Sequence, residues 1–422
     1  MIFLLIILLV FFNVVLLIKV KDFFNPFTMM SLFFFLPMSL STLRLSGLQK
    51  NTWAFESNLI ILASTIVWGV VPFAILFLFG KDNKKEIVYT KRIYKIIRYS
   101  CFAFIIIFLI ENKILFHSYI PILSKNLILL FEKHSASLSF WGIITKGSPL
   151  FCTLALRNYL LFKKKSDLIL TLICLLLPIT RISRLDIMFS IISLSTLLSV
   201  YNAISWKSLV KSKYFFGVVL LSVILFFVFI VSGNFRSSHG NEYEFSTKKI
   251  FQYKGDPGPG EIFAWAYSYF CLPFEDSDRI IANYQNKKFY GQLSISPIVN
   301  GIFFGHVWGN FPNPDIIYNY NERFTNFFAV PTALPYFYMD LGVLGGAFSM
   351  LIYQIILLIL YLKSTKSEFA KIAYCIFLAA FCLSSFQAFI MSAQTTRMIL
   401  IALILFSLPN FFPKKNEIPK EV

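Results

Sequence analysis

Apolar residues recur along the chain in long runs, and short polar segments separate one run from the next. Several runs approach the length of about 20 residues that a helix needs to cross the hydrocarbon core of a bilayer. The pattern predicts an all-α polytopic membrane protein with about eleven membrane-spanning helices. The expected spans are 2–18, 27–43, 58–80, 97–115, 137–161, 167–180, 186–202, 214–233, 332–362, 371–391 and 398–412.

Three segments need separate treatment. The run Met1–Ile18 lacks a basic leader and a small-residue cleavage site, so we expect it to be retained as the first helix. Segment 116–136 is too short and polar to cross, and a helix lying at the membrane interface is expected there. The ninth run is long enough for a tilted or broken helix, and Pro331 and Pro335 predict a break at its start.

Basic residues gather after the first, third, fifth, seventh and ninth expected spans and again in the C-terminal tail. With eleven spans, all six clusters lie on one side of the membrane. The positive-inside rule assigns that side to the cytoplasm, which places the N-terminus outside and the C-terminus inside.

Composition agrees with a membrane protein and changes how the net charge is interpreted. The 422 residues are 57% hydrophobic and 14% charged, with a mean hydropathy of +0.70. A soluble chain of this length would need more charged residues to cover its surface. The net charge of +18 follows from the clusters on one face. It is therefore an orientation signal, and no nucleic-acid partner is expected.

The long polar segment 234–330 divides the chain into three parts. Residues 1–233 form a membrane domain with eight spans, residues 234–330 an external loop, and residues 331–422 three further spans and a cytoplasmic tail. Loops this long usually have a function or structure of their own. The loop also contains aromatic residues that suit either sugar faces or an interfacial aromatic belt: Trp265, Tyr267, Tyr269, Tyr284 and Tyr290.

Cysteine and histidine positions indicate neither a disulfide framework nor a metal centre. Five of the six cysteines lie in expected spans, so Cys271 has no partner in the loop. The four histidines are scattered without a metal-ligand spacing. Asp276-Ser277-Asp278 has the form of the metal-binding motif of nucleotide-sugar transferases, but nucleotide sugars are absent outside the cell. We expect no metal and no cofactor.

Several arginines lie at the expected outer face and are candidates for binding phosphate. Arg181 and Arg184 occupy the short connection before span seven, Arg236 follows span eight, and Arg397 occupies the turn before span eleven. The planar guanidinium suits phosphate and diphosphate oxygens. The alternatives are that Arg181 extends to lipid headgroups and that Arg184 pairs with Asp186.

Other charged or titratable residues in and beside the loop are candidates for further roles. His239, Glu242 and Glu244 are candidates for a general base, and solvated loop charges are the alternative. Arg279 either neutralises the neighbouring aspartates or faces an anionic substrate. For Asp340, among apolar residues near the start of span nine, we expect a structural role such as capping or pairing with an arginine.

These features together resemble the Wzy-type oligosaccharide repeat-unit polymerases, also called O-antigen or capsule polymerases. The features that carry the resemblance are the arginine turn Thr180–Asp186, Asn234-Phe235-Arg236 at the start of the loop, Tyr267–Phe274 within it, and Pro335–Gly345. In the last of these, Leu341 replaces the phenylalanine that is usual in the family.

The resemblance implies a GT-C-like, metal-independent, inverting glycosyltransferase of the bacterial plasma membrane. Such an enzyme transfers a growing glycan from an undecaprenyl-diphosphate carrier to a new lipid-linked repeat unit. Arg184 and Arg236 match the family's loop-associated arginines, and Arg279 and Asp340 match less closely. The expected partners are lipid-linked oligosaccharides, membrane lipid, and the chain-length regulator and flippase of the same pathway.

Two other functions stay open on the sequence. An O-antigen ligase of related fold characteristically carries a histidine in its large loop, which His239 or His306 could supply. A lipid-linked oligosaccharide flippase needs charged residues along a central cavity, for which Glu111 and Lys146 are the candidates in the early spans. The long loop argues against a flippase.

Overall fold

The computed structural model describes residues 2–80, 91–123, 144–181, 183–202, 252–254, 260–285, 288–302 and 330–411. Within these ranges the chain is helical, and the only strand-like pairing is an isolated bridge between Ser46 and Tyr253. The all-helical fold predicted from the apolar runs is confirmed for this part of the chain.

The first helices are α1 (Ile2–Val20), α2 (Pro26–Met30), α3 (Leu36–Ser41), α4 (Phe55–Thr65), α5 (Val71–Phe79) and α6 (Lys91–Phe116). They are followed by α9 (Ser148–Phe162), α10 (Lys165–Leu176), α11 (Arg184–Asn202), α15 (Gly260–Phe270), α16 (Leu272–Asn283), α17 (Gln292–Ile302), α19 (Leu334–Lys363), α20 (Glu368–Leu383) and α21 (Ala393–Phe411). Short π-helical or 3₁₀ turns are η1 (Ser31–Phe35), η2 (Ile66–Val70), η3 (Pro121–Leu123), η4 (Leu177–Arg181) and η5 (Phe389–Met391). Helices occupy ten of the eleven expected runs, and run 214–233 lies outside the described residues.

Three helical segments of the described chain are long and apolar enough to cross a membrane: Phe55–Phe79, Arg92–Leu123 and Leu334–Lys363. Their outward surfaces are apolar as well. On α6 the exposed side chains include Ile106 and Ile114, and on α19 they include Leu344 and Phe348. Hydrocarbon-facing positions of this kind are typical of helices in contact with lipid. Together these features describe a helical membrane protein.

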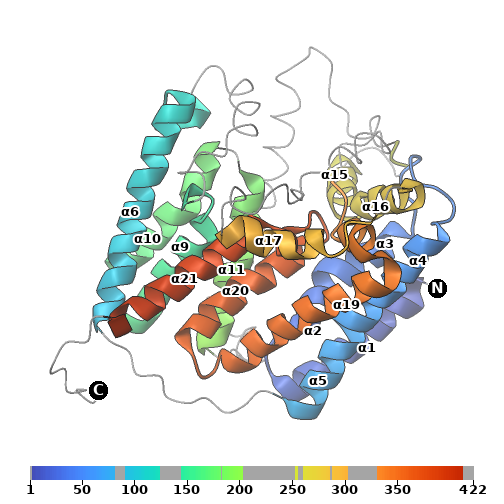
Figure 1. The fold of residues 1–422 in the computed structure, drawn as a ribbon, viewed down its shortest axis with the longest axis horizontal. Coiled ribbons are helices and arrows are strands. Elements are labelled where there is room, and N and C mark those ends of the chain that lie inside the picture. The colour runs from blue at the N-terminus through green and yellow to red at the C-terminus, as the bar shows by residue number, and fades with distance from the viewer. Residues whose placement is uncertain are drawn as a thin grey trace.

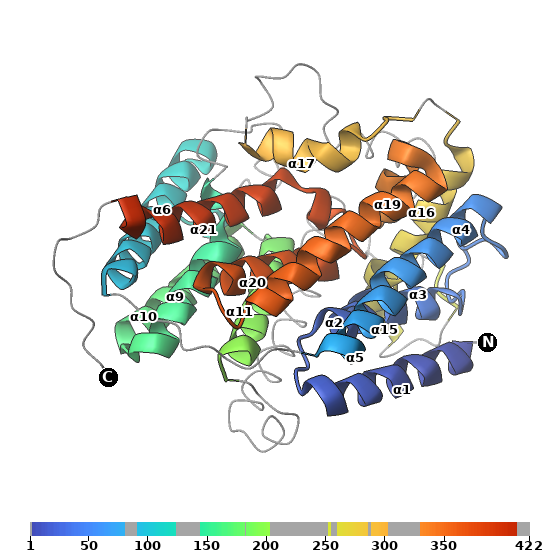
Figure 2. The same ribbon diagram turned by 60° about the horizontal axis from the view of Figure 1, so that its bottom comes forward.

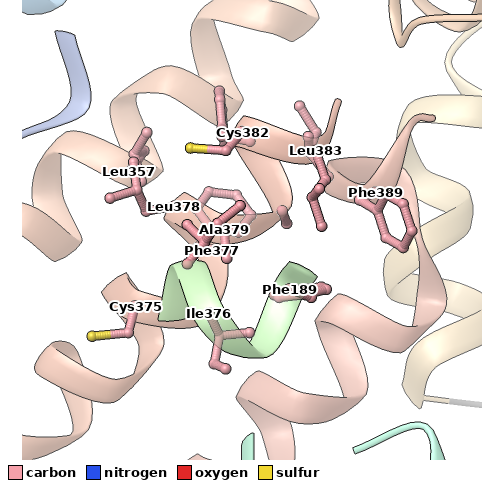
Figure 3. Close-up of a cluster of buried hydrophobic side chains, with 14 of the residues drawn as sticks. Phe189, Leu357, Cys375, Ile376, Phe377, Leu378, Ala379, Cys382, Leu383 and Phe389 are labelled. Carbon is pink, nitrogen blue, oxygen red and sulfur yellow. The ribbon is translucent and has the colours of Figure 1, made fainter. Parts of the chain in front are cut away.

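Helix α20 forms the centre of the described bundle. Every residue from Ala370 to Leu383 is buried, and α20 contacts α9, α11, α19 and α21. Figure 3 shows Leu357 of α19, Phe189 of α11 and Phe389 of η5 around this helix. A helix that is buried on all sides needs no polar face, which explains the apolar sequence of α20.

The other helices form two groups on either side of this centre. In Figures 1 and 2, helices α1–α5 lie on one side and α6, α9 and α10 on the other, with α19–α21 between them. The interhelical contacts agree, because α19 packs on α4 whereas α21 packs on α6. The helices α15 and α16, from the expected external loop, cover the ends of α3 and α4.

Two prolines explain why two of the expected spans contain π-helical turns. Pro37 and Pro72 stand at the second residue of α3 and α5, directly after η1 and η2. Proline lacks an N–H and its ring clashes with the carbonyl four residues earlier, so a wider turn accommodates it. The ring of Phe35 lies against Gly69, where a Cβ atom would be 3.3 Å from the ring.

The break in the ninth expected span occurs at a glycine and not at the prolines. Pro335 lies in the first turn of α19, where a missing N–H is tolerated. Gly342 has φ 73° and ψ −163°, which interrupts the helix about two turns further on. This conformation is accessible essentially only to glycine. The prediction of a break was right, and its position was wrong because Pro335 fits the start of the helix.

We expect Gly342→Ala to destabilise the protein by about 1–3 kcal/mol, because a Cβ atom is strained at this φ and ψ even though the nearest side-chain atom would be 3.9 Å away. Thermal unfolding of the purified protein in detergent measures the change. The control is Leu344→Ala, two residues further along α19 at an exposed position. Equal melting temperatures for the two variants would contradict the assigned strain.

Candidate functional site

Three helices, α9, α11 and α21, begin at one place in the fold. Gln394, the second residue of α21, connects them: its Nε2 donates to the carbonyl oxygen of Lys146 at 2.8 Å and to Oδ1 of Asp186 at 3.1 Å. Lys146 lies two residues before Ser148, the first residue of α9, and Asp186 lies in the first turn of α11. We call these residues and the three first turns the three-helix junction.

Local sequence explains each of these helix starts. The hydroxyl of Ser183 donates to Asp186 at 2.6 Å just before α11, and Pro149 stands in the first turn of α9. The hydroxyl of Ser392 accepts the backbone N–H of Gln394 at 3.1 Å. The N-terminal end of a helix carries partial positive charge and attracts anions. Three such ends meet at the junction.

A basic residue also lies at or near each of the three helix starts. Arg184 is the first residue of α11, and its side chain lies outside the described part. Arg397 follows Gln394 by one turn of α21, so the two share a helix face. Lys146 is exposed. The sequence had predicted Arg184 and Arg397 at one face, and the fold places their helix starts together.

The position of Lys146 differs from the sequence prediction. The apolar pattern predicts one span over 137–161, whereas the chain turns at Lys146 and Gly147 before α9 begins. The signal was present in Gly147 and Pro149, since both residue types are typical of the start of a helix. Lys146 therefore lies at a helix start and not deep inside a span.

Arg181 lies inside the protein. Its guanidinium donates to Glu111 Oε2 at 2.6 Å and to Asn112 Oδ1 at 2.5 Å, and it lies 4.0 Å from the ring centre of Phe108. Glu111 also accepts a hydrogen bond from the hydroxyl of Thr145 at 2.5 Å. The side chains of Arg181 and Glu111 are only 5% and 2% exposed. These contacts fix the connection between α10 and α11 to α6.

Asp340 caps helix α17. Its Oδ1 accepts the backbone N–H groups of Gly291 and Leu293 at 2.9 and 3.1 Å. Its Oδ2 accepts the N–H and the hydroxyl of Ser294 at 2.8 and 2.6 Å. A second contact joins the same helices, from the hydroxyl of Tyr353 to the Ser294 carbonyl at 2.8 Å. A carboxylate at a helix N-terminus is stabilised by the N–H groups and by the dipole.

Arg397 holds the opposite end of α17. Its Nη2 donates to the carbonyl oxygen of Asn300, in the last turn of that helix, at 2.8 Å. A cation at a helix C-terminus is favourable for the same reason that an anion is favourable at the N-terminus. Helix α17 consequently lies across α19 and α21 (Figure 2), beside the three-helix junction.

The acidic motif of α16 and Arg279 bind the protein's own segment 48–54. The contacts are Arg279 Nη2 to Leu48 O at 2.6 Å, Lys50 N to Glu275 Oε1 at 3.0 Å, and Ala54 N to Asp278 Oδ1 at 2.7 Å. Ala54 precedes the first residue of α4, so Asp278 accepts an N–H at the start of that helix. Arg279 therefore has a third role besides the two expected from the sequence: it holds this segment against α16.

The structure describes only some of the remaining candidate residues. Arg236, His239, Glu242 and Glu244 lie outside the described residues, and so does the side chain of Trp265. The hydroxyl of Tyr267 donates to Gln49 at 2.7 Å inside the fold, whereas Tyr290 is 75% exposed. In the described ranges, no group of three or more histidine, cysteine or acidic residues is arranged to hold a metal.

No family model, no curated protein and no solved structure matches this chain.

We expect Asp340→Asn to loosen α17, because the amide keeps only one acceptor oxygen and turns an N–H₂ group toward N–H donors. A loss of about 2 kcal/mol corresponds to roughly thirtyfold faster exchange of the amide hydrogens of the first turn of α17. Hydrogen exchange with mass spectrometry measures the rate in residues 292–302.

The control for this experiment is Tyr353→Phe, which removes one uncharged hydrogen bond to the same turn. It should accelerate exchange by less than Asp340→Asn, since uncharged hydrogen bonds contribute less. Equal exchange in wild type and Asp340→Asn would contradict the capping role.

Asp276 is the buried acid of this region without a hydrogen-bond partner among the described residues. Its side chain is 0% exposed and neither carboxyl oxygen is satisfied. Burial raises the pKa of the Asp276 carboxyl well above its usual value, and the positive charge of Arg279 opposes this only in part. Burial thus favours the protonated acid.

We expect Asp276→Asn to change how stability depends on pH. Above about pH 4 the unfolded chain loses the Asp276 proton while the folded chain keeps it, so folding stability falls as pH rises toward the folded pKa. The Asp276→Asn variant has no carboxyl group at this position, so it lacks this fall in stability. Its melting temperature in detergent, relative to wild type, should therefore increase from about pH 4 to pH 8.

Ser277→Ala is a matched control on the same helix, because it removes a buried hydrogen bond to Thr332 without removing a titrating group. Its difference from wild type should be the same at every pH. A constant difference for Asp276→Asn as well would show that Asp276 is ionised in the folded protein.

Proposed function

We propose that this protein is a membrane glycosyltransferase that polymerises undecaprenyl-diphosphate-linked oligosaccharide repeat units at the outer face of the bacterial plasma membrane. The observation that carries the proposal is the three-helix junction. There, three helix starts meet, and each carries a basic residue in or next to its first turns: Lys146, Arg184 and Arg397. Such a site suits the diphosphate of a lipid-linked substrate.

The proposed reaction follows from the chemistry of the substrate. The terminal hydroxyl oxygen of one repeat unit attacks the anomeric carbon of the lipid-linked glycan, and the bond from that carbon to the diphosphate oxygen breaks. The diphosphate leaves with the electron pair, and the hydroxyl proton passes to a base. Diphosphate is a good leaving group, so electrostatic stabilisation of its charge is the main task of the protein.

The candidates for the base are His239, Glu242 and Glu244, which share with Arg236 the start of the expected external loop. In this proposal the long loop covers the sugar, and α17 is the described part of it that lies beside the junction. The proposed topology has about eleven spans in a GT-C-like arrangement, with the N-terminus outside and the C-terminus in the cytoplasm.

The flippase alternative receives less support from the contacts. Of its two candidate cavity residues, Glu111 is paired with Arg181 and Lys146 lies at a helix start. Those positions do not form a charged path through the bundle. The ligase alternative uses the same kind of donor and differs in the acceptor, so it is distinguished by product.

We expect Arg184→Ala and Arg397→Ala to lower polymer formation at least a hundredfold, by the loss of charge at the leaving diphosphate. The measurement is elongation of lipid-linked repeat units by purified protein in liposomes. Lys165→Ala, an exposed lysine at the start of α10 and outside both the junction and the loop, should leave the rate unchanged. Arg397 also holds α17. Arg397→Lys keeps the positive charge, so this variant separates the loss of charge from the loss of the contact with α17.

The products of the same assay distinguish the alternatives. Longer lipid-linked chains are expected. Movement of single units across the liposome without elongation would identify a flippase, and transfer to a lipid core acceptor would identify a ligase. Undiminished elongation by both alanine variants would remove the junction as the site.

A further inference from the structure

We propose that Lys146 binds the donor phosphate as a third cation of the junction and that Arg181, buried behind it, is the residue that positions it. The inference rests on the proposed function, since it concerns the same site. It also changes the role expected for Arg181, from a phosphate ligand to a positioning residue.

The backbone at Lys146 is held on two sides. Its carbonyl oxygen accepts the amide of Gln394 at 2.8 Å. The preceding residue, Thr145, is 2% exposed, and its hydroxyl donates to Glu111 at 2.5 Å. The next residue, Gly147, donates its N–H to the carbonyl of Ile144 at 2.8 Å, which closes the turn. The Lys146 backbone is therefore fixed in place.

The side chain of Lys146 is available for a ligand. The residue is exposed, and its ammonium has no hydrogen-bond or ion-pair partner among the residues that the structure describes. A cation fixed by its backbone loses less freedom on binding than one on a loose segment. Lysine is a compact point charge with three donors, suited to phosphate oxygens at variable angles.

Arg181 is unsuited to bind the substrate because it is buried and most of its donors are already used. Its Nη2 and Nε are bonded to Glu111 and Asn112, and its Nη1 lies 3.4 Å from the hydroxyl of Thr145. Removing one partner of a buried ion pair leaves an uncompensated charge. Arg181 and Glu111 therefore act as a unit that holds Thr145 on one side.

The same unit also lies close to the start of α11. Arg181 ends η4, and Arg184 begins α11 three residues later. One buried pair thus holds Thr145, beside Lys146, and Arg181, before α11, while Gln394 joins both segments to the third helix. The ligand class is a phosphate or diphosphate on a lipid, held where the three helices begin.

Binding of farnesyl diphosphate, a short lipid diphosphate, to the full-length protein in phosphatidylcholine nanodiscs tests Lys146 without requiring turnover. We expect Lys146→Ala to raise the dissociation constant about tenfold, the loss of one charge-assisted contact. Lys146→Arg should restore most of the affinity, and Lys165→Ala, at an exposed position outside the site, should bind as wild type does. Wild-type affinity in Lys146→Ala, alongside weakened binding in Arg184→Ala, would overturn the inference and leave the proposed function standing.

Probe binding by the wild type and competition by an anionic lipid test the inference further. Absence of probe binding by wild type would overturn both the inference and the proposed function. Added phosphatidylglycerol should not displace the probe. Displacement that depends on Lys146 would show that the site takes ordinary anionic headgroups, and it would overturn the assignment to the donor diphosphate.

Thr145 tests the positioning role, because its hydroxyl connects the buried pair to Lys146. Thr145→Val keeps the side-chain volume and removes the hydroxyl, and it should weaken probe binding several-fold in the folded fraction. Thr145→Ser keeps the hydroxyl and should rescue binding. A purely structural role would lower the melting temperature of Thr145→Val without changing the affinity of the folded protein, and that result would overturn the positioning role.

Discussion

A backbone N–H group or a charged side chain that leaves water without a partner costs several kcal/mol in an apolar environment. In this chain the helix ends meet that constraint with side chains. Asn25 accepts the N–H of Thr28 at the start of α2, and Ser367 accepts that of Ala370 at the start of α20. Asp340 does the same for α17 from another helix. The arrangement of the described helices depends on these polar contacts as well as on apolar packing.

The apolar periodicity predicted where the helices lie, because local hydropathy determines which segments are helical in lipid. It did not predict where the helices are interrupted. Gly342 breaks α19 and Lys146 begins a turn, whereas Pro335 fits a first turn without a break. Both interruptions depend on local chemistry that a smoothed apolar pattern averages away. Segments 116–136 and 214–233 lie mostly or wholly outside the described residues, so those predictions stay predictions.

The candidate site could be predicted only as a set of residue types at one face. Arg184 and Arg397 were expected near each other, but the contact that brings their helices together passes through Gln394, which carries no charge to draw attention. Glu111 and Arg181 lie 70 positions apart in the chain, and Asp340 lies 46 positions from Ser294. A sequence without aligned relatives contains no signal for such pairs.

Helix α17 has a mechanical consequence because both of its ends are tied to different helices. Its eleven residues give a length of roughly 16 Å at a rise of about 1.5 Å per residue. Asp340 of α19 holds one end and Arg397 of α21 the other. The helix, which contains Pro297 in its interior, therefore acts as a strut between two bundle segments. Any sliding of α19 against α21 must first detach one end of it.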